Sequence, residues 1–100
     1  MENDETLYKD PLLEVRFSPR HDGYYLILGS QSIFLMNGGL EELARTAVAD
    51  MKRKVTAINP LGEFILERQG VSYERLGMAI AQARNRELEQ ELRQAYSEQS

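Results

Sequence analysis

The sequence predicts a single α+β domain in which a three-stranded antiparallel β-meander is followed by a long amphipathic helix, a short helix or hairpin, and a long C-terminal helix. Two patterns carry this prediction. Apolar residues alternate or run together in short segments before residue 37, and they recur every three or four residues after it. A length of 100 residues suits one hydrophobic core, and 42% hydrophobic with 28% charged residues is a globular composition.

The first ten residues are expected to form a flexible acidic arm, because four acidic residues stand there among few apolar anchors. Pro11 then restricts the chain before the first expected strand. The remaining residues 11–100 are expected to make one α+β domain, with residues 85–100 as a projecting C-terminal helix.

Three strands are expected in the first half of the chain. Residues 12–17 alternate between apolar and charged side chains, which indicates a half-buried strand. Residues 24–28 and 33–36 are apolar at every position, and the turn formers at 29–32 join them as a hairpin. Because both faces of this hairpin are apolar, one face should pack on the protein's own helices and the other should need a further helix, a second subunit or a partner.

The helices follow from residue 40 onward. Apolar residues from Leu40 to Ile58 step by three or four and predict one continuous helix of about five turns. Residues 59–70 allow either a short helix or a turn that joins two strands, and the unbroken spacing through Ile58 favours the helix. Ser72 is a suitable N-cap for a last helix that runs to about Tyr96.

A local resemblance concerns residues 61–68 and 70–76, an amphipathic segment, a Gly-Val-Ser step and a segment that contains Leu76. They resemble the opening of a lambda-repressor-type helix-turn-helix domain. The connection between the two segments is shorter than in that family, and residues 80–84 continue the helix where a turn and a recognition helix should follow. The resemblance therefore assigns no DNA-contacting residue.

We expect no enzymatic activity, cofactor or metal site, because no catalytic apparatus is recognisable. The chain has no Cys, which excludes disulfides and thiolate metal sites. The single His21 stands between Arg20 and Asp22, near Ser18, and is interpreted as an exposed loop residue.

Charge and targeting features indicate the setting. The net charge is −4, the N-terminus is acidic where a secretory signal would be basic, and no apolar run approaches the roughly 20 residues of a membrane helix. The expected location is the cytoplasm, in a bacterial or phage setting.

The leading hypothesis is a small protein-binding module, such as an adaptor, a chaperone-like factor or a regulator of a larger protein machine, that also associates with itself as a homodimer. Its candidate partner-binding residues lie on the hairpin and on a stripe of the last helix: Tyr25, Ile27, Ile33, Leu35, Leu88, Leu92 and Tyr96.

The alternative hypothesis is a nucleic-acid-binding regulatory protein. Basic clusters on two helices would supply its phosphate contacts: Lys52, Arg53, Lys54, Arg84, Arg86 and Arg93. An acidic net charge and the glutamates interleaved among the last three arginines favour the protein-binding hypothesis.

Overall fold

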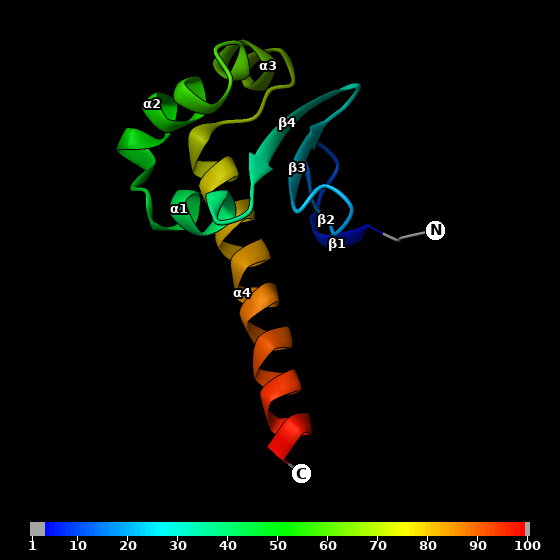
Figure 1. The fold of residues 1–100 in the computed structure, drawn as a ribbon. Coiled ribbons are helices and arrows are strands. Elements are labelled where there is room, and N and C mark those ends of the chain that lie inside the picture. The colour runs from blue at the N-terminus through cyan, green and yellow to red at the C-terminus, as the bar shows by residue number, and fades with distance from the viewer. Residues whose placement is uncertain (1–3, 100) are drawn as a thin grey trace.

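The computed structural model describes residues 4–99, over which a four-stranded antiparallel sheet of order β1-β2-β3-β4 is followed by four helices (Figure 1). The elements are β1 (Glu5–Lys9), β2 (Glu14–Ser18), β3 (Gly23–Leu28), β4 (Gln31–Met36), α1 (Gly39–Arg45), α2 (Val48–Ile58), α3 (Gly62–Arg68) and α4 (Tyr73–Gln99). The α+β class, the antiparallel meander and the long last helix are confirmed. Two expectations are corrected.

The first correction concerns the expected flexible acidic arm. Its residues 5–9 form the strand β1, and residues 1–3 lie outside the described residues. This strand pairs with β2 from Glu5 opposite Phe17 to Lys9 opposite Glu14, with a bulge between Thr6 and Tyr8. Leu7 is its one fully buried side chain. A single apolar anchor gives no periodicity to detect, and the strand depends on β2 and α4, which lie beside it.

The second correction concerns the long helix expected from residue 40 to residue 58. It is two helices, because Thr46 and Ala47 both take extended backbone angles. Thr46 ends α1, and its hydroxyl donates a hydrogen bond of 2.9 Å to the carbonyl of Glu42. The apolar spacing runs on across this break, so periodicity alone did not reveal it.

The segment after residue 58 forms a helix, which settles the alternative between helix and hairpin. The side chain of Asn59 accepts a 3.0 Å hydrogen bond from the amide of Leu61, just before α3 begins. Ser72 accepts a 3.2 Å bond from the amide of Arg75 and caps α4, as expected.

The core lies between one face of the sheet and the helices. Val15, Leu26 and Leu35 point from the sheet toward α1 and α4, while α2 packs beside α4 and α3 packs on α2. Along α4 the last fully buried residue is Ala83. Glu87 and Gln90 still contact the sheet, and after them the helix extends away from the sheet and the other helices (Figure 1). In the described part of the chain, no helix combines the length and apolar character needed to cross a membrane.

Candidate functional site

The outer edge of β4 carries unpaired backbone groups. Gly29 and Ser30 form a two-residue turn between β3 and β4, with Gly29 at a positive φ of 63°. Residues that flank such a turn, here Leu28 and Gln31, exchange backbone hydrogen bonds, and the pattern then alternates along the strands. The N–H and C=O groups of every second residue of β4 therefore point away from β3: those of Ser32, Phe34 and Met36. Within residues 4–99, no other segment forms a backbone hydrogen bond with them.

The side chains of the same residues lie on the face of the sheet that the helices leave uncovered. Phe34 is 38% exposed and Met36 is 76% exposed. The Phe34 ring packs against Tyr25 at a centroid distance of 5.1 Å. It also lies over Gly23, where an added Cβ would be 2.4 Å from the ring. Tyr25 and Ile27 are half-buried on this face among their cross-strand neighbours.

A groove of about 970 Å³ runs along this edge. One wall is β4 itself, from Ser32 to Met36. The other side is formed by the turn that leads into α1, by Glu42, and by the corner between α2 and α3, where Ile58 and Pro60 contribute apolar surface. An open strand edge thus borders this groove.

The position of the α2–α3 corner depends on a close approach between two helices. An added Cβ on Gly62 would be 2.5 Å from Cγ1 of Val55 and 3.3 Å from its carbonyl oxygen. Asn59 caps the corner through its hydrogen bond to Leu61. Local packing therefore holds Ile58 and Pro60 at the groove.

The structure separates the four candidate residues of the hairpin. Tyr25 and Ile27 lie on the uncovered face, whereas Ile33 and Leu35 are fully buried against the protein's own helices and belong to the core. Phe34 and Met36, which sequence reasoning did not select, take their place at the surface. A strand with apolar residues at every position does not indicate which face is inside. Pairing of Leu26 with Ile33 and of Tyr25 with Phe34 decides it.

The other candidate partner-binding residues lie on the second half of α4. Leu88, Leu92 and Tyr96 are all exposed, the last two at 59% and 72%. They are far from the β4 groove along the chain and line no part of it.

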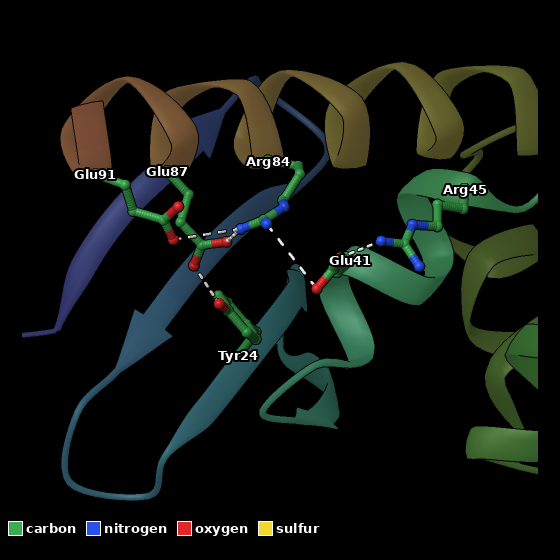
Figure 2. Close-up of polar contacts among 6 residues, drawn as sticks. All are labelled: Tyr24, Glu41, Arg45, Arg84, Glu87 and Glu91. Atoms are coloured by element: carbon green, nitrogen blue, oxygen red, sulfur yellow. Dashed lines mark hydrogen bonds and ion pairs between the residues drawn. The ribbon is translucent and has the colours of Figure 1, made fainter.

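A polar network anchors α4 to the sheet and to α1 (Figure 2). The Tyr24 hydroxyl donates a hydrogen bond to Glu87, which also pairs with Arg84. Arg84 reaches Glu91 at 3.7 Å and Glu41 at 3.9 Å. Burial, together with the hydrogen bond to Glu87, raises the pKa of Tyr24 above its ordinary value. The members of this network are paired with one another, so its role is structural.

The basic candidates are dispersed, and most have acidic partners. Lys52 pairs with Glu63 at 2.9 Å, Lys54 pairs with Glu42, and Arg53 lies 3.8 Å from Asp50.

The remaining basic candidates lie on α4. Arg84 belongs to the network just described, and Arg86 and Arg93 line a groove between α4 and β1 together with Glu89. The six basic residues therefore do not form one continuous positive surface.

The loop between β2 and β3 holds Ser18 and His21 at 3.1 Å between Oγ and Nδ1. Ser18 is only 1% exposed, so its hydroxyl cannot meet a substrate in this conformation. Asp22 is turned toward Asn37, whose side chain donates a 3.0 Å hydrogen bond to it. Across the described residues, no three His, Asp or Glu side chains are grouped as a metal site would require.

Comparison with known proteins gives no relative, since no family model, curated protein or solved structure matches this chain. The structural features above therefore carry the functional argument alone.

Proposed function

We propose that this protein is a small protein-binding module of the adaptor, chaperone-like or regulatory kind, and that it binds an extended segment of its partner along β4. One observation supports the proposal most strongly, namely the coincidence of an open strand edge with an apolar groove. Strand addition uses both features, because backbone hydrogen bonds supply affinity while pockets select alternate side chains.

The chemistry of the groove defines the segment that it would accept. The outward groups of Ser32, Phe34 and Met36 would pair with the backbone of the incoming strand. Ile58 and Pro60 would contact its apolar side chains on one face. Glu42 at the rim is already paired with Lys54, so the groove offers no unpaired charge. The expected ligand is an extended peptide with apolar, β-branched side chains at alternate positions.

Selection from a display library of random peptides tests this proposal. Peptides of about eight residues suffice to span β4. Selected peptides should share the alternating apolar pattern. On binding, the amides of Ser32, Phe34 and Met36 should become protected from hydrogen exchange, whereas those of Ile33 and Leu35 should be protected already in the free protein.

A matched pair of variants on α2 provides the control. Ile58 and Val48 are almost equally exposed, at 41% and 42%, but only Ile58 lines the groove. Ile58→Lys should weaken peptide binding about tenfold or more by removing an apolar contact, and Val48→Lys should leave it unchanged. Equal loss in both variants, or protection of amides away from β4, would contradict strand addition.

A further inference from the structure

One face of α4 carries a heptad pattern that the folded chain leaves exposed. The residues of this face are spaced alternately three and four positions apart, and all are exposed: Met78, Ala81, Asn85, Leu88, Leu92 and Ala95. We call this face the α4 seam. It lies opposite the face of α4 that carries the buried residues Leu76, Ala79, Ile80 and Ala83.

This spacing is that of a coiled coil and differs from the packing of α4 on its own domain. Alternating steps of three and four average 3.5 residues, the repeat that keeps a narrow seam facing a second helix. The seam runs for about 26 Å at 1.5 Å per residue. In Figure 1 no element of the described chain lies beside the last turns of α4.

The polar contacts of α4 fix the direction in which the seam points. Arg84, Glu87 and Glu91 point toward β3 and α1 in Figure 2, where they meet Tyr24 and Glu41. On the side of β1, Gln90 donates a hydrogen bond to Glu5. These contacts hold the core face inward and place the seam on the opposite side of the helix, where Asn85 also lines the groove that α4 forms with Leu7 of β1.

We propose that a second copy of this chain covers the α4 seam, with the two α4 helices parallel and in register. In heptad terms Met78, Asn85 and Leu92 take the first apolar position. A polar residue at this position is characteristic of paired helices whose register is fixed. In register, each Asn85 amide faces the same amide of the second copy and can both donate to it and accept from it.

The opposite orientation is less favourable for the same residue. In an antiparallel pair centred on the seam, Asn85 would face Leu88 of the second copy and lose its amide partner.

Sedimentation equilibrium from micromolar to millimolar protein tests the association. The unaltered chain should show a monomer–dimer equilibrium. Leu92→Glu should raise the dimer dissociation constant about tenfold or more, while Gln94→Glu, an exposed position of α4 outside the seam, should change it less than about twofold. Circular dichroism at low concentration should show that both variants are folded. A chain that stays monomeric over this range overturns the proposal.

Disulfide trapping tests the orientation, and the absence of native Cys makes the result simple to interpret. Under mild oxidation Leu88→Cys should cross-link to itself much faster than Gln94→Cys. The antiparallel arrangement would give the opposite result: Asn85→Cys chains would cross-link to Leu88→Cys chains, and Leu88→Cys would not cross-link to itself. That result would overturn the parallel arrangement.

The α4 seam shares no residue with the β4 groove. The experiments on the two surfaces therefore test the two proposals separately.

Discussion

At the residue scale, Asp10 illustrates a role that no local pattern indicates. Its carboxylate accepts hydrogen bonds from Tyr8 at 2.6 Å, from the amides of Leu12 and Leu13 at 2.7 and 2.9 Å, and from Arg75 at 3.2 Å. It thereby joins the β1–β2 turn to the first turn of α4. The sequence assigns Asp10 to a flexible arm, because its partner Arg75 is 65 residues away along the chain. Only the folded structure brings the two together.

The pKa of Asp10 makes this role measurable. Burial alone would raise its pKa, but the hydrogen bonds from Tyr8, Leu12, Arg75 and Leu13 outweigh burial and lower the value from 3.8 to about 2. A lowered pKa stabilises the folded state above the unfolded-state pKa, and this contribution is lost as the pH falls from about 4 to about 2. It amounts to about 2 kcal/mol.

Asp10→Asn removes this titration. The variant should lose about 2 kcal/mol of unfolding free energy at neutral pH, and its deficit relative to the unaltered chain should disappear near pH 2. Urea unfolding followed at several pH values measures both curves. A deficit that does not change between pH 4 and pH 2 would show that Asp10 acts through packing and not through its charge.

The contact between Gly62 and Val55 gives a second prediction at this scale. Gly62→Ala places a methyl group 2.5 Å from Cγ1 of Val55, whose β-branched side chain has little freedom to move away. The cost should be about 1–3 kcal/mol of unfolding free energy. Val55→Ala opens space at the same point. In the double variant Gly62→Ala/Val55→Ala the loss should therefore be smaller than the sum of the single losses by at least about 0.5 kcal/mol. Simple additivity would contradict a steric origin.

At the element scale, the pattern of apolar residues predicts helices and strands well but not their ends or faces. It detects β2, β3, β4 and α4, because their apolar residues are dense and periodic. It joins α1 to α2, because both helices use the same apolar spacing while packing on different neighbours. It also does not show which face of β4 is buried, because both faces are apolar. Only the pairing of β4 with β3 identifies the exposed residues of the candidate site.

The break between α1 and α2 can be tested by one substitution at two positions. Ala47 is the N-cap of α2, with φ −63° and ψ 147°, and no side chain caps the helix. Ala47→Ser should add a capping hydrogen bond and stabilise the protein by about 0.5–2 kcal/mol. Ala57→Ser, at an exposed position inside α2, should destabilise it by up to about 0.7 kcal/mol through lower helix propensity. Thermal or urea unfolding that shows the same loss in both variants would instead indicate a helix continuous through residue 47.

At the scale of the whole molecule, the two proposed surfaces lie on different parts of the fold. The β4 groove lies at one sheet edge, beside α1 and the α2–α3 corner, and the α4 seam lies on a helix face turned away from the core. A dimer formed through α4 would leave both grooves open. Two linked grooves bind a partner with repeated segments more tightly than one groove does, through effective concentration.

Truncation of α4 separates folding from association in a single chain. Ala83 is the last buried residue of α4, and the hydrogen bonds from Tyr24 to Glu87 and from Gln90 to Glu5 end at residue 90. Beyond them Glu91 is exposed and lies 3.7 Å from Arg84, a pair that contributes little to stability. A chain of residues 1–90 should therefore fold, with a melting temperature at low concentration lowered by no more than about 4–8 °C, the shift that corresponds to 1 kcal/mol in a domain of this size. A chain ending at Gln82 loses Ala83, Arg84 and Glu87 and should melt far lower.

The melting temperature of the full chain should rise with protein concentration, because dimerisation stabilises the folded state. The melting temperature of residues 1–90, which lack Leu92 and Ala95, should not change with concentration. Differential scanning calorimetry over a range of concentrations distinguishes these outcomes, and equal concentration dependence in both chains would place the contact between copies outside the end of α4.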